Sequence, residues 1–213
     1  MNTASRLPLE GVRVVEFTHM VMGPTCGMIL ADLGAEVIKI EPPGGDKTRN
    51  LPGLGIGFFR SFNRNKKSVV LDINTETGRA AAVELIGQCD VVLENFRPGL
   101  MEKLGLDYAT LSQRYPRLIY VSHKGFLPGP YEKRLALDEV VQMMGGLAYM
   151  TGPAGRPLRA GTSVNDIMAA CSARSACSPR CASAISLDAA RKCRARSSRI
   201  ACSSVRSTCS NTR

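Results

Sequence analysis

A strand–turn–helix–strand pattern between residues 11 and 41 constrains the fold more than any other part of this 213-residue chain. Residues 11–17, GVRVVEF, have the composition of a buried strand, and residues 25–35, TCGMILADLGA, that of an apolar helix. A second strand, EVIKIEPP, follows at 36–43. Two strands and a helix within about thirty residues form one βαβ unit, whose strands are parallel. The turn at 18–24 also leaves free backbone N–H groups at a helix N-terminus, where an anion can bind.

The same alternation continues to residue 126. Strands are expected at 67–73, 90–96 and 117–126, and helices at 75–89, 99–106 and 108–116. Short strands rich in Val and Ile that alternate with helices predict a parallel sheet covered by helices on both faces. We therefore expect an α/β fold with a Rossmann-like parallel sheet and flanking helices.

Ligands of such sheets bind beyond the carboxyl ends of the strands. Three expected strand ends carry polar residues: Thr18–His19–Met20, Glu94–Asn95–Phe96–Arg97 and Ser122–His123–Lys124. His123 is interpreted as a core or loop histidine. The GxGxxG fingerprint is absent, which argues against an ordinary NAD-binding domain.

Four stretches in this order resemble the class III CoA-transferases (CaiB/BaiF type), which include formyl-CoA transferase, carnitine CoA-transferase and α-methylacyl-CoA racemase. The stretches are residues 16–43, 62–78, 91–108 and 159–167, and the resemblance covers residues 7 to about 170. It implies that this region is the N-terminal part of the family's large domain. It also implies an enzyme that moves CoA from an acyl-CoA to a free carboxylic acid.

The resemblance assigns the catalytic carboxylate to Asp166. In the family this carboxylate attacks the thioester to form a mixed anhydride, and CoA then returns to form an aspartyl-CoA thioester. Covalent catalysis of this kind divides a difficult exchange into easier steps. The carboxylate must be ionised and lie close to N–H donors that stabilise an oxyanion. From the sequence alone an alternative stays open, in which Asn165 or Asp166 caps a helix that begins at Ile167.

The resemblance also implies a CoA-binding set that is spread over the strand ends. Its members are Met20, Val21, Met22, Leu71, Asp72, Ile73, Asn74, Asn95, Phe96, Arg97, Lys103 and Asp138. Arg97 or Lys103 would pair with a phosphate of CoA, and Asp138 would be a second acid near the active site. The alternatives are methionines that pack under a helix, solvated surface charges, and a helix N-cap at Asp138.

Transferase and racemase chemistry make different demands on the position before Asp138. The racemase branch has a histidine there, since a two-base proton exchange needs a base on each face of the α-carbon. Leu137 occupies this position, so a transferase is favoured and a racemase-like isomerase is the alternative. Pro42 and Leu135 stand where formyl-CoA transferases have Arg and Lys, so the donor and acceptor acids stay open.

The composition changes near residue 170. Residues 171–213 hold six of the eight cysteines, nine Lys or Arg and a single acid, so most of the formal net charge of +10 belongs to this segment. It lacks the CxxC pairs and histidines of a zinc site, and a nucleic-acid-binding arm would not need cysteines. Cys and Ser codons read one base earlier encode Met, Val, Leu, Ile and Phe. We therefore expect two regions, a CoA-transferase part at 1–170 and a disordered, out-of-frame tail at 171–213.

An out-of-frame tail implies a frameshift near residue 170. The chain would then be a truncated fragment, either inactive or aggregated. No metal and no cofactor are expected, because CoA is itself a substrate. The two cysteines before the tail suit a reducing cytoplasm, the N-terminus lacks a secretory pattern, and no apolar run reaches the ~18 residues of a membrane span. The expected partners are an acyl-CoA and a carboxylic acid, with an interlocked homodimer implied by the family, and neither nucleic acid nor membrane.

Overall fold

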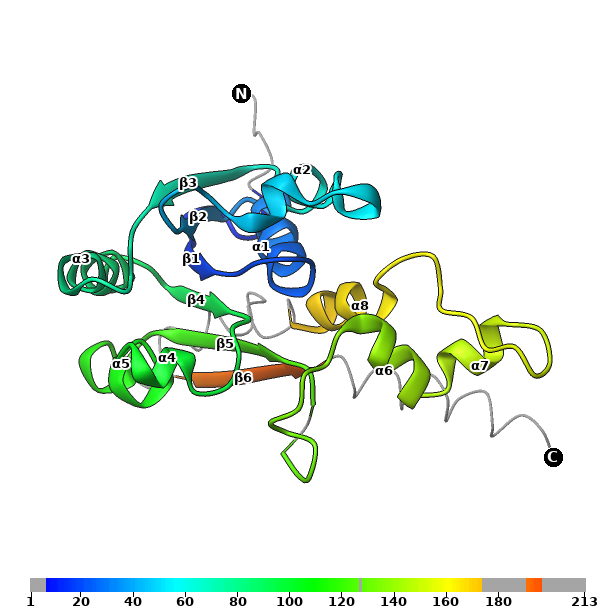
Figure 1. Cartoon of the computed structure of the whole chain (residues 1–213). Coiled ribbons are helices and arrows are strands. Elements are labelled where there is room, and N and C mark those ends of the chain that lie inside the picture. Colours follow the sequence, from blue (N-terminus) through cyan, green and yellow to red (C-terminus); the bar gives the residue numbers. More distant parts are fainter. Residues whose placement is uncertain (1–6, 127, 174–190, 197–213) are drawn as a thin grey trace.

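A parallel sheet organises the part of the chain that the structure describes (Figure 1). The structure is a computed structural model that describes residues 7–126, 128–173 and 191–196. Six strands lie in the order β3-β2-β1-β4-β5-β6, and every neighbouring pair is parallel. The strands are β1 (Arg13–Phe17), β2 (Glu36–Glu41), β3 (Lys66–Val70), β4 (Val91–Glu94), β5 (Ile119–Lys124) and β6 (Arg191–Arg196). The predicted α/β fold with a parallel sheet and flanking helices is confirmed.

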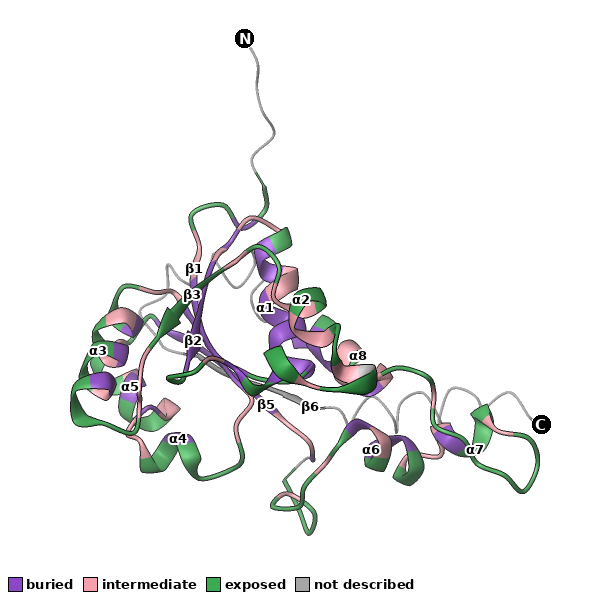
Figure 2. Ribbon diagram, turned by 45° about the horizontal axis from the view of Figure 1, so that its top comes forward, coloured by how far each residue is buried: buried purple, intermediate pink, exposed green. Residues whose placement is uncertain are grey.

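Different helices pack on the two faces of this sheet. The helices are α1 (Met22–Asp32), α2 (Phe58–Phe62), α3 (Glu76–Gly87), α4 (Leu100–Lys103), α5 (Tyr108–Arg114), α6 (Asp138–Met144), α7 (Leu147–Thr151) and α8 (Val164–Ala173), with 3-10 turns η1 (Lys47–Asn50) and η2 (Gly53–Gly55). Figure 2 shows α1 and α8 on one face and α3 and α5 on the other. The helices α6 and α7 extend away from the sheet (Figures 1 and 2).

Each face of the sheet has its own apolar core. Val14 of β1 packs with Leu30 of α1 and Ala170 of α8. The next residue, Val15, packs with Ile86 of α3 on the opposite face. Successive strand residues point to opposite faces, so a strand buried on both sides needs apolar residues at consecutive positions. This explains the Val-Val and Val-Ile runs of β1, β2 and β4.

Helix α1 lies unusually close to β1 because it carries two glycines. A Cβ atom on Gly23 would lie 2.6 Å from Thr18 Cγ2, and one on Gly27 would overlap the carboxylate of Glu16. The helix begins at Met22, earlier than predicted, so Pro24 falls in its first turn. Proline is tolerated there because N–H groups of the first turn have no partner within the helix.

Two expectations about the sheet and its neighbours are wrong. Helices do not cover β3 on both faces, since it is an edge strand, and Val69 and Val70 are 36% and 59% exposed. The segment expected to be disordered contains β6, which pairs with β5 from Arg191 to Arg196. Backbone pairing at an open parallel edge needs no particular side chains, so composition did not predict it. Helix α8 also runs past residue 170 to Ala173, and the remainder of 174–213 lies outside the described residues.

Apolar side chains are exposed where α6 and α7 leave the sheet. They include Leu137, Val140, Met143, Met144, Tyr149 and Met150, each at least 37% exposed. Several exposed apolar side chains on two successive short helices are typical of an interface with another part of a protein or with a partner. Within the described ranges, no helix is long and apolar enough to cross a membrane.

Candidate active site

The strand order reverses at β1, which lies between β2 and β4. Ligands of open α/β sheets bind at such a switch point. The loops that follow β1 and β4 meet there through a reciprocal pair of hydrogen bonds: the His19 backbone N–H donates to Asn95 Oδ1 at 3.0 Å, and Asn95 Nδ2 donates to the His19 carbonyl at 2.7 Å. The rings of His19 and Phe96 lie 5.7 Å apart. Two of the predicted CoA-binding segments are therefore adjacent.

The turn after β1 is held in a special conformation. Met20 has a φ of 64°, which is unusual for a residue other than glycine, and its N–H donates to Thr48 Oγ1 at 3.1 Å. Met20 is 38% exposed, whereas Val21 and Met22, at the start of α1, are buried. Met22 therefore packs in the interior, which is the alternative to CoA binding given above. Met20 is the methionine that a ligand can reach.

A buried ion pair supports this turn from below. Lys39, which is 1% exposed, donates to the Thr18 carbonyl at 2.5 Å and pairs with Asp46 at 3.0 Å. Asp46 in turn accepts from the Thr48 N–H at 2.8 Å. Lysine, aspartate and threonine therefore form a continuous chain of contacts to the Met20 N–H. The sequence analysis did not identify Lys39 or Asp46, because a lysine within an apolar strand is not a recognisable motif.

The segment Leu71–Asn74 lies at the same edge of the sheet but farther from the switch point. It follows β3, and β2 separates β3 from β1. Leu71 and Ile73 pack against the core under α3, while Asp72 Oδ1 accepts from the Asn74 N–H at 3.0 Å. Only Asn74 of these four is exposed.

Arg97 and Lys103 are both exposed. Arg97 follows Phe96 at the end of β4, and Lys103 closes α4. Among the described residues neither side chain forms an ion pair or a hydrogen bond. Both cations are therefore accessible to an anion at the carboxyl edge.

Asp138 and Asp166 meet although 28 residues separate them in the chain. The Asp166 backbone N–H donates to Asp138 Oδ1 at 3.0 Å, and Asp138 is 4% exposed. Asp166 is half-buried in the first turn of α8. The helix begins at Val164, so neither Asn165 nor Asp166 is its N-cap, and that alternative is wrong. Asp138 is the first residue of α6, and its Oδ1 accepts from the backbone of α8.

The environment of Asp166 strongly perturbs its acidity. Burial raises the pKa of its carboxyl to about 7, and the negative charges of Asp138 and Glu139 act in the same direction. Perturbed carboxyl groups of this kind are concentrated at functional sites. Once ionised, such a carboxylate is more basic, and hence more nucleophilic, than an ordinary aspartate.

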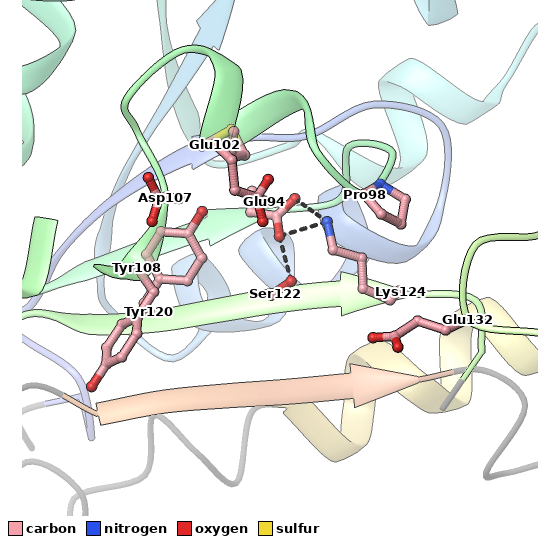
Figure 3. Close-up of a pocket in the computed structure, with 10 residues that line it drawn as sticks. Glu94, Pro98, Glu102, Asp107, Tyr108, Tyr120, Ser122, Lys124 and Glu132 are labelled. Atoms are coloured by element: carbon pink, nitrogen blue, oxygen red, sulfur yellow. Dashed lines mark hydrogen bonds and ion pairs between the residues drawn. The ribbon is translucent and has the colours of Figure 1, made fainter. Parts of the chain in front are cut away.

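A small cavity of about 80 Å3 lies beside β4 and β5 (Figure 3). Glu94 accepts hydrogen bonds there from Ser122 and from Lys124, the latter at 2.9 Å. Glu102 and Asp107 also line it. An acidic cavity of this size repels phosphates, so we do not assign CoA to it. The polar strand ends that contain Glu94 and Ser122 were predicted, but their mutual pairing was not.

His123 is a core residue, as predicted. It is 2% exposed, burial lowers its pKa to about 4, and its Nε2 has no hydrogen-bond partner in the part of the chain that the structure describes. A second concavity lies over α2, where the Arg49 guanidinium stacks 3.8 Å above the Phe59 ring and bonds Glu41 at 2.7 Å. Within the described ranges no cluster of His, Cys, Asp and Glu has the arrangement of a metal site.

Comparison with known proteins identifies the family to which this chain belongs. Residues 9–185 match CoA-transferase family III. The formyl-CoA:oxalate CoA-transferase of Bradyrhizobium sp. (strain ORS 278) is 43% identical over 164 residues, which cover 74% of this chain and 39% of that protein. The acetyl-CoA:oxalate CoA-transferase of Acetobacter aceti is 45% identical over 168 residues, or 75% of this chain and 43% of that protein. The chain thus spans about two fifths of the curated relatives it matches.

Solved structures agree with this assignment. A hypothetical protein from Mycobacterium tuberculosis superimposes with a TM-score of 0.86 and 35% identity over 97% of this chain and 60% of that chain. A CAIB/BAIF family protein from Brucella suis gives a TM-score of 0.82 and 34% identity over 97% of this chain and 57% of that chain. The strand order, the sequence match and these superpositions all point to the same family, and the chain belongs to CoA-transferase family III.

Proposed function

We propose that this protein takes part in transfer of CoA from an acyl-CoA to a free carboxylic acid, with Asp166 as the nucleophile. The observation that carries the proposal is the placement of Asp166 in the first turn of α8, half-buried and with its pKa raised to about 7. At neutral pH a useful fraction is ionised, and the free N–H groups of a helix N-terminus favour negative charge nearby.

The chemistry needs no proton transfer and no metal. A carboxylate oxygen of Asp166 attacks the thioester carbon, the C–S bond breaks, and CoA thiolate leaves a mixed anhydride. The thiolate then attacks the aspartyl carbonyl and releases the donor acid, which carries one former oxygen of Asp166. The acceptor carboxylate attacks the resulting aspartyl-CoA thioester, and the released thiolate attacks the acceptor carbonyl. This yields the new acyl-CoA and regenerates the carboxylate of Asp166.

We propose that CoA lies over the switch point between β1 and β4. The Met20 turn and the Asn95–Phe96 loop are joined there, and Arg97 supplies an exposed cation nearby. Asn74 and Lys103 lie farther along the same edge and suit the distal, phosphate-bearing part of CoA. Both relatives named above use oxalate, so oxalate is the first acceptor acid to test.

The test is single-turnover labelling of the 213-residue chain. Incubation with acetyl-CoA or formyl-CoA, followed by digestion and mass spectrometry, should find CoA attached to the peptide that contains Asp166. Asp166→Asn should abolish the adduct, whereas Glu84→Gln, at an exposed carboxyl on α3, should retain it. An adduct of equal yield in Asp166→Asn would overturn the assignment of the nucleophile. A proton exchange at the α-carbon without an adduct would favour the racemase-like alternative.

We also propose that residues 171–213 are translated out of frame and that this chain does not sustain repeated turnover, although a single exchange at Asp166 can still be followed. The codon argument and the concentration of Cys, Ser and Arg after residue 170 support this. The exposed apolar side chains of α6 and α7 support the further proposal that the complete family member buries this surface in a homodimer. Resequencing codons 160–180 tests the first point: an inserted base should open a long apolar frame, and an uninterrupted frame as written would contradict it.

A further inference from the structure

Gln142 lies one helical turn after Asp138 on α6 and is fully buried. Residues four apart share one face of a helix, and Gln142 Nε2 donates to Asp138 Oδ2. The same nitrogen donates to the Thr162 carbonyl at 3.2 Å, and Gln142 Oε1 accepts from the Ala160 N–H at 2.7 Å. The side-chain amide of Gln142 thus both donates to and accepts from the backbone of the segment that leads into α8.

The two oxygens of Asp138 have separate partners. One accepts from Gln142, and the other accepts from the backbone N–H of Asp166 at 3.0 Å. A carboxylate held at both oxygens has a fixed orientation. Together the two side chains connect α6 to the backbone at 160, 162 and 166, on both sides of the turn that precedes α8.

A side chain that only filled space would not need these polar groups. Burial of an amide is costly unless its groups are hydrogen-bonded, and an apolar side chain of similar size would fill the same volume. We propose that Gln142 is a positioning residue for Asp166: it orients Asp138 and fixes the 160–162 segment, so that the Asp166 carboxyl is held at the start of α8. This inference rests on the proposed nucleophilic role of Asp166.

The charged groups that act on Asp166 come mainly from α6. They are Asp138 and Glu139, and Glu139 forms an exposed ion pair with Arg159 at 3.8 Å. On α1, which packs against α8, the charged residue is Asp32, paired with Arg64 at 2.5 Å, and the titratable Cys26 is buried. Replacing Gln142 by an acid therefore adds a charge to a cluster that already contains three carboxyl groups.

The test replaces Gln142 by Glu and follows the carboxyl titration of Asp166 by carbon-13 NMR. Gln142→Glu keeps the shape and the acceptor for Ala160 but turns a donor into a charge that faces Asp138. We expect the pKa of Asp166 to increase by about one unit or more. Gln113→Glu, the same change at an exposed position on α5, should leave this pKa unchanged.

A swap variant keeps the test decisive if Gln142→Glu folds poorly. Asp138→Asn combined with Gln142→Glu restores one carboxylate and one amide at these positions, and with them the donor–acceptor pair. The swap should be more stable than Gln142→Glu and should return the Asp166 pKa toward the wild-type value, although the Thr162 carbonyl still lacks its donor. Wild-type titration in Gln142→Glu, or a swap no better than the single variant, would overturn the proposal.

This experiment separates the two proposals because titration needs no substrate. A missing CoA adduct in the wild-type chain would remove the nucleophilic role of Asp166 while the shift in Gln142→Glu could still be measured. An adduct in the wild type with no shift in Gln142→Glu would retain the nucleophile and remove the positioning role. If both proposals hold, Gln142→Glu should lower the rate of adduct formation at pH 7 by about fivefold or more. The acyl-CoA concentration that gives half the maximal rate should change little.

Discussion

Asp138 and Asp166 lie on different helices, and the backbone N–H of Asp166 donates to Asp138 Oδ1 at 3.0 Å. The contact brings the two carboxyl groups close together. Burial, and to a smaller extent the charge of Asp138, raises the pKa of Asp166 to about 7. The contact thus fixes the start of α8, and the charge of Asp138 helps to raise the pKa of the Asp166 carboxyl in the first turn of that helix.

Asp138→Asn should lower the pKa of Asp166. Asparagine keeps an oxygen that can accept from the Asp166 N–H but removes the negative charge that disfavours ionisation. We expect a decrease of about one unit, measured as a shift of the acid limb of adduct formation to lower pH. Glu139→Gln should give a smaller shift, since Arg159 pairs with Glu139. An unchanged acid limb in Asp138→Asn would show that Asp138 does not act through its charge.

Asp166→Asn should stabilise the folded chain at neutral pH. The pKa of Asp166 is about 7 in the folded state and 3.8 in a model peptide, so between these values the folded state binds the extra proton. The free energy of unfolding therefore decreases as pH rises from about 4 to 7, by roughly 2–4 kcal/mol. Asparagine removes this penalty, so the variant should be more stable above pH 7 and no more stable at pH 4. Denaturant titrations at both pH values measure this.

The control for that experiment is Glu84→Gln, at an exposed carboxyl on α3. It should leave the pH dependence of unfolding as it is in the wild type. Equal stabilities of Asp166→Asn and wild type at pH 8 would be incompatible with a raised pKa.

Lys39→Met should destabilise the chain and loosen the turn at Met20. The substitution leaves Asp46 buried without its cation, and removing one partner of a buried pair costs roughly 3–5 kcal/mol. The Thr18 carbonyl also loses its donor. Lys47→Met, at an exposed neighbour, should change the unfolding free energy by less than about 0.5 kcal/mol. Similar losses in both variants would argue against the buried pair as the support of the turn.

Gly27→Ala should weaken the packing of α1 on β1. The added Cβ overlaps the carboxylate of Glu16, which is fully buried and bonded to Lys66 at 2.9 Å. We expect a loss of roughly 1–3 kcal/mol. Gly57→Ala is the matched control, because its Cβ would meet no atom closer than 3.9 Å. Thermal unfolding of the two variants compares the sites, and equal melting temperatures would contradict the close approach.

The sequence predicted β1, β2, β4 and β5 well because these strands are buried on both faces, and it predicted the helices between them from their period. The consecutive apolar residues of β1 and β4 are a local signal of such burial. In contrast, β6 depends on backbone pairing with β5, and its residues, RKCRAR, carry no strand pattern. The start of α1 was also predicted too late in the sequence, because the proline in its first turn resembles a loop signal.

Site prediction depended on whether a residue is recognisable without its neighbours. Asp166, Asn95 and Asp138 were predicted from the resemblance of the sequence around them to class III CoA-transferases. Lys39 and Asp46 are visible only in three dimensions, because β2 and the following turn bring them together under Met20. Gln142 could have been found from its spacing of four residues after Asp138, which places both on one helical face. Its contacts with Ala160 and Thr162 depend on the tertiary fold.

Oxygen transfer through Asp166 tests the central claim most directly. The 213-residue chain is first loaded with unlabelled acyl-CoA and then given an acceptor acid labelled with oxygen-18, and the peptide that contains Asp166 is weighed. If Asp166 is the nucleophile, the acceptor's attack on the aspartyl-CoA thioester leaves one labelled oxygen on its carboxyl group, and Asp166→Asn takes up none. A wild-type peptide that forms no CoA adduct and gains no label would contradict the account.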